Sequence, residues 1–282
     1  MTRTPERVTV SAMGGTWHAE TVGSLLSLAS WSGEVASVHA RAVNVHRPDG
    51  LVVSLLAGSE AMSDLGLVVP DLFDPDGARL NNPLGRPVAA RRGLLYIDGC
   101  GTVESGGAAR WTGKVQPGVA GSGRGPASPG FAAILARHGR PGGVVGLADP
   151  RRESPWSAAA RRCLQREPPD LAALVGLGPG MTPSGDDFLA GALFALRLGW
   201  GRLPVGLTPA RLRRAVAVAL PGTTPAGRTL LWLALRGRFP APLLALASAE
   251  DVRAAAAAVC GYGETSGTDM LVGCWWACRQ AP

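Results

Sequence analysis

Two glycine-rich segments in the second half of the chain hold most of its concentrated polar residues. The first covers residues 178–191, with the sequence GPGMTPSGDDFLAG, and the second covers residues 261–273, with the sequence GYGETSGTDMLVG. Aligned with a one-residue gap opposite Pro183, both carry Gly, Thr, Ser, Gly, Asp, Leu and Gly in the same order. Each leads into an apolar, helix-like run, so we expect two helix N-termini built to one plan. The first N–H groups of a helix lack partners inside it, and such ends bind anions.

Helix capping alone accounts for part of this pattern. With Ser184 and Ser266 as N-caps, Asp187 and Asp269 stand at the third helical position and complete an acidic version of the capping box. Negative charges at that place also suit the helix dipole. These four residues are therefore explained by two well-capped helices, without any function.

The residues that capping does not require favour a functional site. The glycines before each cap permit positive φ and a close approach of the backbone to a ligand. Thr182 and Thr265 add hydroxyl donors on the same turns, and Asp186 is a candidate to sit outward as a base, a ligand orienter or a metal ligand. The predicted catalytic residues are Asp186, Asp187 and Asp269. The predicted substrate-binding residues on the two turns are Gly178, Gly180, Thr182, Ser184, Gly185, Thr265, Ser266 and Gly267.

A third helix start contributes one more candidate. Arg228 follows the sequence Thr223-Thr224-Pro225, which is typical of a helix N-terminus. Its guanidinium would make a charge-assisted contact to an oxyanion, whereas a solvated helix arginine is the alternative interpretation. We add Arg228 to the predicted substrate-binding residues.

The two glycine-rich segments resemble the signature motifs of a bacterial family that includes a subunit of the oxamate carbamoyltransferase of allantoin degradation. That enzyme interconverts oxalurate and phosphate with oxamate and carbamoyl phosphate. Residues 38–45 and 49–55 are similar to an earlier block of the same family, which adds Asn44 to the predicted binding residues. Where relatives tend to carry a Gly-His pair, this chain has Gly261-Tyr262, so a histidine role is not carried over.

The resemblance implies a carbamoyltransferase-like enzyme or enzyme subunit that binds a small phosphate or carboxylate compound. It also implies other subunits as partners, and we consider a homo-oligomer as well. A second hypothesis is a hydrolase or lyase in which Asp186, Asp187 and Asp269 converge on Mg²⁺, since hard cations prefer oxygen ligands. A third is a non-catalytic subunit of a larger complex.

The elements that must position these residues change type along the chain. Residues 35–45 and 51–56, separated by the turn sequence RPDG, predict a hairpin, and residues 93–98 predict another strand. Periodicity and breakers predict helices in the second half, at residues 131–137, 155–166, 170–175, 184–198, 209–220, 225–235, 249–259 and 266–279. We therefore expect an α+β chain with a β-rich part at 1–114, a flexible Gly/Pro-rich loop at 115–130 and a helical part at 131–282 that carries both motifs.

Composition narrows the class of protein. The net charge is +7 over 282 residues, but Lys114 is the only lysine and the arginines are scattered, so we do not expect nucleic-acid binding. No apolar run reaches the length of a membrane helix, and no signal peptide is evident at the N-terminus. Five cysteines without a CxxC pair predict reduced thiols and a cytoplasmic protein. The four histidines lack the spacing of a zinc site.

Overall fold

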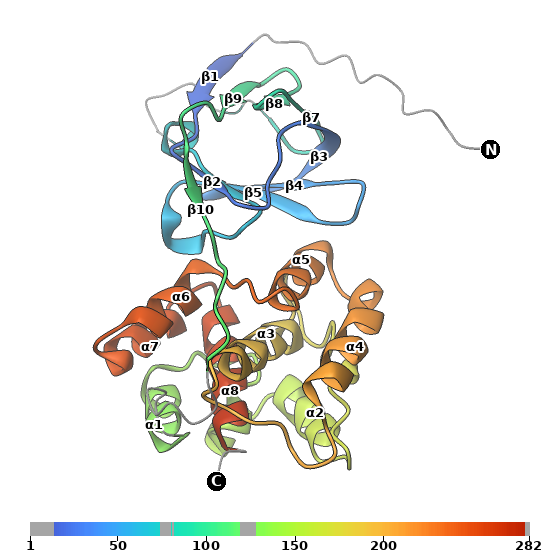
Figure 1. Cartoon of the computed structure of the whole chain (residues 1–282), viewed down its shortest axis with the longest axis vertical. Coiled ribbons are helices and arrows are strands. Elements are labelled where there is room, and N and C mark those ends of the chain that lie inside the picture. The colour runs from blue at the N-terminus through green and yellow to red at the C-terminus, as the bar shows by residue number, and fades with distance from the viewer. Residues whose placement is uncertain (1–13, 74–79, 81, 119–127, 280–282) are drawn as a thin grey trace, which may run out of the picture. The chain divides into compact units, whose positions relative to one another are not determined.

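The computed structural model describes residues 14–73, 80, 82–118 and 128–279, which divide into two compact units (Figure 1). The boundary lies between Thr112 and Gly113. We call residues 14–112 the β unit and residues 113–279 the helical unit. The order of strands first and helices second confirms the α+β class predicted from the sequence.

The β unit contains short strands. They are β1 (Gly15–His18), β2 (Thr21–Gly23), β3 (Ser30–His39), β4 (Ala42–His46), β5 (Val52–Leu56), β6 (Gly66–Val68), β7 (Pro87–Arg91), β8 (Leu94–Ile97), β9 (Gly101–Glu104) and β10 (Ala109–Trp111). They form one sheet in the order β1-β9-β8-β7-β3-β4-β5-β6-β2-β10. Alternation along the strands turns one side chain in two inward, as in β8, where Leu95 and Ile97 are buried.

The first and last segments of the β unit join the two ends of the sheet. Only Ala19 and Glu20 separate β1 from β2, and both of these strands pair in parallel, with β9 and β10 respectively. The N–H of Ala19 donates to the carbonyl of Glu104 at 2.8 Å, and the N–H of Ala109 donates to the carbonyl of Glu20 at 2.8 Å. Pairing is thus continuous from β1–β9 into β2–β10, and the strands form the ring seen in Figure 1.

The predicted hairpin is present, but its first strand is shorter than expected. β4 and β5 pair antiparallel across the turn that contains Asp49 and Gly50, as predicted. The segment 35–45 is not one strand, because the chain reverses at Ala40 and Arg41 and β3 pairs with β4. Neither residue is a strong turn former, so the sequence carried no signal of that reversal.

The helical unit contains one short helix that the sequence did not predict. Its helices are α1 (Ser128–His138), α2 (Pro155–Leu164), α3 (Ser184–Arg197), α4 (Pro209–Ala219), α5 (Pro225–Ala234), α6 (Ala241–Ser248), α7 (Val252–Cys260) and α8 (Ser266–Arg279). α6 was missed because its sequence, APLLALAS, is nearly uniformly apolar and has no amphipathic period. The helix predicted at 170–175 is only a 3-10 turn over Ala172–Leu174.

The first residues of the helical unit, 113–118, are hydrogen-bonded to the rest of that unit. The N–H of Val115 donates to the carbonyl of Gly237 at 2.9 Å, and the N–H of Gly118 donates to the carbonyl of Arg197 at 2.8 Å. Residues 119–127 of the predicted loop lie outside the described residues, and α1 begins at Ser128.

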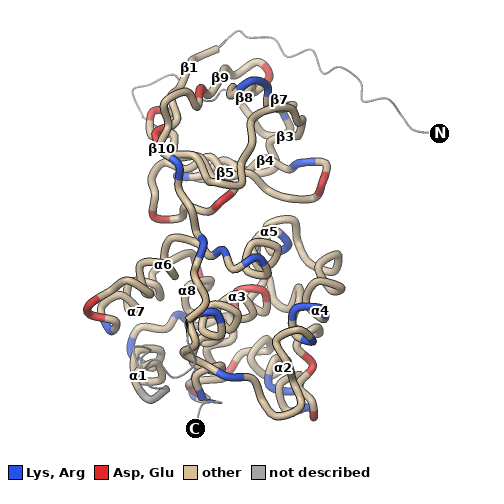
Figure 2. Tube along the Cα trace, in the orientation of Figure 1, with Lys and Arg blue, Asp and Glu red and all other residues tan. Residues whose placement is uncertain are grey.

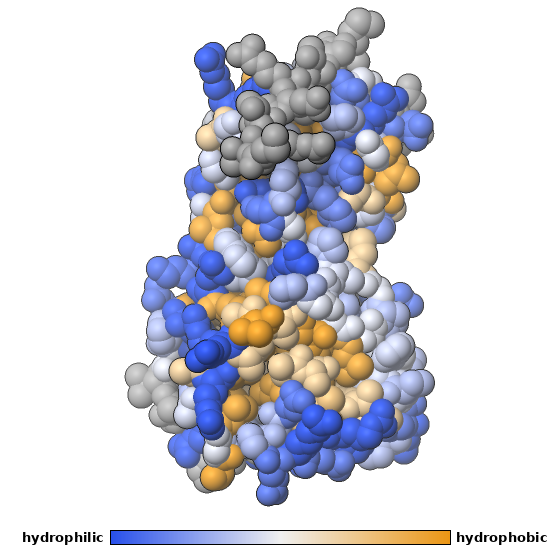
Figure 3. Space-filling view, turned by 90° about the vertical axis from the view of Figure 1, so that its right-hand side faces the viewer, coloured by the Kyte–Doolittle hydropathy of each residue, from blue (hydrophilic) through white to orange (hydrophobic). Residues whose placement is uncertain are grey.

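Charged residues are distributed over both units in the part of the chain that the structure describes. In Figure 2 the positive residues are spread over many elements of both units. Figure 3 shows hydrophobic residues gathered in the middle of the visible face of the helical unit, above a hydrophilic lower edge. None of the described helices is long and apolar enough to cross a bilayer. The described cysteines form no disulfide, and all but Cys163 are buried.

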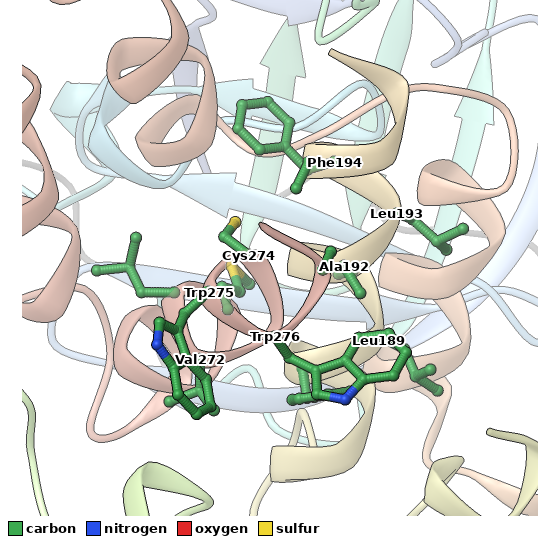
Figure 4. Packing of buried hydrophobic residues seen from close by; sticks show 14 of the residues in the cluster. Leu189, Ala192, Leu193, Phe194, Val272, Cys274, Trp275 and Trp276 are labelled. Carbon is green, nitrogen blue, oxygen red and sulfur yellow. The ribbon is translucent and has the colours of Figure 1, made fainter. Parts of the chain in front are cut away.

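The centre of the helical unit is the crossing of α3 and α8. Two glycines bring the backbones together: a Cβ on Gly191 would lie 1.8 Å from the carbonyl oxygen of Met270, and one on Gly273 would lie 1.9 Å from that of Phe188. Around this contact pack the buried side chains in Figure 4, from Leu189 on α3 to Trp276 on α8. The close contact fixes the relative position of the two helix N-termini.

Candidate functional site

Both helices begin where the sequence predicted, but α3 is not capped as predicted. α3 begins at Ser184 with Pro183 as the N-cap, and no side chain caps it. The predicted capping box of Ser184 and Asp187 is therefore wrong. Proline at the cap position supplies no side-chain acceptor, and the Ser184 hydroxyl has a partner from another part of the chain.

The two glycine-rich turns meet at their hydroxyl groups. Thr182 Oγ1 lies 3.0 Å from Ser266 Oγ, although the two residues are far apart in the sequence. The Thr182 hydroxyl also lies 3.1 Å from Asp187 Oδ2 of its own segment. Both segments thus contribute to one polar cluster at the start of α3 and α8.

The hydroxyls of Ser184 and Ser266 each interact with the aspartate of the other glycine-rich segment. The carboxyl of Asp269 interacts with the hydroxyls of Ser184 and Thr265, and the carboxyl of Asp187 interacts with those of Ser266 and Thr182. Each carboxyl thus interacts with the hydroxyl of the threonine in its own segment and with the hydroxyl of the serine in the other segment. Among the described residues, Asp187 Oδ1 and Asp269 Oδ2 are buried and have no hydrogen-bond partner.

Burial raises the pKa of both carboxyls, those of Asp187 and Asp269. Both side chains have no exposed surface. Desolvation, and then repulsion from Asp269, raises the pKa of Asp187 well above its ordinary value. Desolvation raises the pKa of Asp269 to about 6, against the hydrogen bond from the N–H of Val144 at 2.7 Å and those from Ser184 and Thr265. Burial therefore favours the neutral form of both carboxyls, and repulsion from Asp269 adds to this effect at Asp187.

Asp186 does not sit outward, contrary to the expectation from the sequence. It is fully buried, and its carboxyl accepts hydrogen bonds from the N–H of Gly176 at 2.8 Å and from the hydroxyl of Thr223. A Cβ on Gly227 would lie 2.1 Å from Asp186 Oδ2, so the first turn of α5 packs directly on this carboxyl. Asp186 thus ties the turn before α3 to the start of α5.

The backbone of the two turns differs in its use of glycine. Gly176, Gly178 and Gly180 all have positive φ before α3, whereas before α8 only Gly263 does. Gly261, at the end of α7, has φ of −76°, so it does not adopt the positive φ that the sequence led us to expect. Gly180 and Met181 are exposed, so part of the turn before α3 lies at the surface.

One neighbouring segment was not anticipated. The N–H of Arg140 donates to Thr268 Oγ1 at 3.0 Å, and its guanidinium donates to the carbonyl of Gly263 at 2.7 Å. A Cβ on Gly143 would lie 2.3 Å from both carboxyl oxygens of Asp269. The sequence ArgProGlyGly at 140–143 signals only a turn, and nothing in it indicates that Asp269 lies against it.

Two predicted binding residues have other partners. Arg228 donates from its guanidinium to the carbonyls of Leu220 and Pro221, at the end of α4. Asn44 belongs to the β unit, where its amide contacts the hydroxyls of Ser37 at 3.0 Å and Ser54 at 2.7 Å. None of these contacts involves the polar cluster of the two glycine-rich turns.

The three carboxylates do not converge on one point. Asp186 is held by Gly176 and Thr223, while Asp187 and Asp269 face the serine and threonine hydroxyls of the two turns. Over the part of the chain that the structure describes, no group of three or more His, Cys, Asp or Glu side chains is arranged to hold a metal ion. The magnesium hypothesis therefore finds no ligand set there.

Comparison with known proteins identifies a family whose model matches part of the helical unit. The model of a family described as oxamate carbamoyltransferase subunit AllH matches residues 174–278. The matched range begins before the first turn and ends within α8, so it contains both glycine-rich segments and confirms their resemblance to this family; residues 38–55 lie outside the matched range. No curated protein and no solved structure matches the chain.

Proposed function

We propose, from the match of residues 174–278 to the oxamate carbamoyltransferase subunit family, that this chain is a subunit of a carbamoyltransferase-type enzyme. In this proposal the two turns form its binding site for a small phosphate or carboxylate compound, of the oxamate or carbamoyl phosphate type. The observation that supports the proposal is the 3.0 Å contact between Thr182 Oγ1 and Ser266 Oγ, because it brings hydroxyl groups of the two turns together.

The proposed ligand would replace the contact between these hydroxyls. The hydroxyls of Thr182, Thr265 and Ser266 would donate to its oxygens, and the backbone at Gly178 and Gly180 would approach it closely. The Arg140 guanidinium, held on the carbonyl of Gly263, would supply positive charge at the rim. Ser184, Gly185 and Gly267 are buried, so they would hold the site in position without direct exposure to solvent.

The aspartate pair would take different parts in the reaction. Carbamoyl transfer develops negative charge on the carbonyl oxygen of the carbamoyl group, and a donor aimed at that oxygen stabilises it. A protonated Asp187, whose Oδ1 has no partner among the described residues, would be such a donor. A charged Asp269 would orient the hydroxyls of Ser184 and Thr265. Two carboxyls with separated pKa values are a common basis for such a division of roles.

Partner subunits form part of the proposal. The family name designates a subunit, and large exposed hydrophobic patches often mark contact surfaces between proteins. The patch on the helical unit in Figure 3 is where such a contact would form. A homo-oligomer would be an alternative use of the same surface.

The test measures thermal stability of the whole chain with carbamoyl phosphate, oxamate or inorganic phosphate. A ligand at about a hundred times its Kd stabilises a protein by about 2.7 kcal/mol, which is a clear rise in Tm. We expect this rise for the wild type and its loss in the double variant Thr182→Val, Ser266→Ala. Ser248→Ala, an exposed serine on α6, is the matched control and should respond as the wild type does.

Two results would separate the hypotheses. No shift with any of the three compounds at millimolar concentration would contradict the binding site, and would favour a non-catalytic subunit. A shift that persists in the double variant would move the ligand away from these turns. Asp187→Ala should retain binding but lose turnover in the assembled enzyme, because alanine has no donor for the carbonyl oxygen, whereas Asp187→Asn, whose amide still donates a hydrogen bond, should keep part of the turnover.

A further inference from the structure

We propose that the β unit carries a separate binding site for a small organic anion. The site is a cavity of about 410 Å³ between the loop of residues 24–29 and the turn that joins β7 to β8. Ligand pockets in proteins commonly have volumes of about 300–1,000 Å³. All residues that line it belong to the β unit, so it is independent of the two glycine-rich turns.

The charge of the lining residues indicates the class of ligand. Arg92 and Arg110 line the cavity, and no aspartate or glutamate does. Two guanidiniums without an opposing carboxylate in the wall form a suitable place for a phosphate or carboxylate group. The other part of the wall is apolar, with Leu26 and Leu28 among its residues, and would receive the carbon part of the ligand.

The hydroxyl groups of the cavity are not equivalent. The Ser24 hydroxyl donates to Asp64 at 2.5 Å, and the Ser105 hydroxyl donates to the carbonyl of Gly93 at 2.7 Å. Their protons are therefore already used within the protein. The donors left for an anion are the two guanidiniums, together with the exposed Ser27. The ligand would thus be held mainly by charge-assisted hydrogen bonds.

The backbone of Arg92 is a second, independent observation. Arg92 has φ of 52° and Gly93 has φ of 85°, and the two form the whole turn between the paired residues Arg91 and Leu94. Such two-residue turns require positive φ at both positions and favour Asn, Asp or Gly at the first. An arginine in this conformation is strained, and strained residues cluster at binding and active sites. Stability of the hairpin would favour glycine or asparagine here, so the arginine side chain is the feature that requires an explanation.

The walls of the cavity are held in place before any ligand binds. On one side the N–H groups of Arg92 and Gly93 donate to the carbonyls of Ala29 at 3.3 Å and Leu28 at 3.0 Å. On the other side Arg110 Nη2 donates to the carbonyl of Ser24 at 3.1 Å. Because loop and turn are already fixed, a ligand loses less affinity to the ordering of its site.

The test is isothermal titration calorimetry of the whole chain with phenyl phosphate, benzoate and inorganic phosphate. We expect the wild type to bind one of the aromatic anions more tightly than inorganic phosphate, and the preferred one identifies the charged group. Arg92→Gly should weaken binding about tenfold or more, because it removes one charge-assisted contact. The same variant should have an equal or higher Tm, because glycine relieves the strain at this position. Weaker binding without loss of stability would exclude misfolding as its cause.

Two further variants complete the test. Arg110→Gln should also weaken binding about tenfold or more. Arg41→Gln, which removes an exposed arginine outside the cavity, is the matched control and should leave binding unchanged. The proposal is overturned if none of the three anions binds, or if Arg92→Gly binds as the wild type does. It is also overturned if binding is lost in Thr182→Val, Ser266→Ala, since the anion would then bind at the helical unit.

Discussion

The turn that leads into α3 and the turn that leads into α8 share their residues at corresponding positions and use some of them differently. Thr182 corresponds to Thr265, and each interacts with the aspartate of its own segment. Ser184 corresponds to Ser266, and each interacts with the aspartate of the other segment. The residues common to both turns therefore build a single cluster that neither turn contains alone.

The positions at which the turns differ serve a different purpose. Asp186 corresponds to Thr268, and each accepts a backbone N–H from a neighbouring loop: Gly176 for Asp186 and Arg140 for Thr268. The repeated residues thus join the two turns, and the residues that differ anchor each turn to its own surroundings. Identity between two motifs marks what they do together, and divergence marks what each does locally.

The largest effect should come from the glycines at which α3 and α8 touch. Gly191→Ala or Gly273→Ala would place a Cβ within 2 Å of a backbone carbonyl, at 1.8 Å and 1.9 Å respectively. We expect each to lower the free energy of unfolding by at least about 3 kcal/mol, since the helices must separate. Urea unfolding followed by far-UV circular dichroism, which reports the helices, measures the loss.

The control for these variants is Gly222→Ala, since a Cβ at Gly222 meets no atom within 4 Å. It should change the free energy of unfolding by less than about 1 kcal/mol. If Gly191→Ala and Gly273→Ala differed greatly from each other, the equivalence of the two helices at their crossing would be contradicted.

The second expected effect is a dependence of the free energy of unfolding on pH, caused by Asp187 and Asp269. The pKa of both is raised by burial, so between about pH 4 and 6 the unfolded chain releases these protons while the folded chain keeps them. The free energy of unfolding must then fall as the pH rises. For Asp269, a rise in pKa from 3.8 to about 6 corresponds to a loss of about 3 kcal/mol over that window.

Asparagine variants assign the loss to each carboxyl. Both carboxyls contribute between about pH 4 and 6, so each variant should remove only its own part of the fall: Asp269→Asn the part from Asp269, and Asp187→Asn the part from Asp187, whose pKa is raised well above its ordinary value. Urea midpoints at a series of pH values measure both. The same pH profile in both variants would show that the two sites are not electrostatically distinct. Asp71→Asn, exposed in the β unit, serves as control.

The smallest expected effect is on the two residues that hold the turns to neighbouring loops, Asp186 and Thr268. Asp186→Ala removes the acceptor of both Gly176 N–H and the Thr223 hydroxyl, and should cost about 2 kcal/mol. Thr268→Val removes the acceptor of Arg140 N–H and should cost about 1 kcal/mol. Asp186→Asn is the matched control, because its amide oxygen still accepts a hydrogen bond, and it should cost less than alanine. An alanine variant as stable as the wild type would mean that Asp186 does not anchor the turn.

Local sequence rules predicted where α3 and α8 begin but not the partners of their first residues. Serine, glycine and aspartate before an apolar run indicate a helix start, and both helices do begin at Ser184 and Ser266. The hydroxyl of Ser184 and the carboxyl of Asp269 meet because Gly191 and Gly273 let the helices cross closely, which is a tertiary effect. Asp186 looked free to face a ligand because Thr223, its partner, lies in a distant segment.

The fold class was predictable for a similar reason. Alternation and turn residues identified β4, β5 and β8, and periodicity identified most helices. The order of strands in the sheet, and the closure through Ala19 and Ala109, depend on pairing between distant segments. No local pattern in the sequence encodes that pairing.

The short stretch of residues 113–118 decides where the chain can be cut. Val115 is buried in the core of the helical unit, and the Arg197 side chain donates to its carbonyl at 2.9 Å. The N–H of Phe239 donates to the carbonyl of Gly113 at 2.9 Å. A fragment that starts at residue 131, where the helical periodicity begins, would leave these groups without partners and uncover apolar surface. A fragment of the helical unit, for expression or for fusion to another protein, should therefore begin at Gly113.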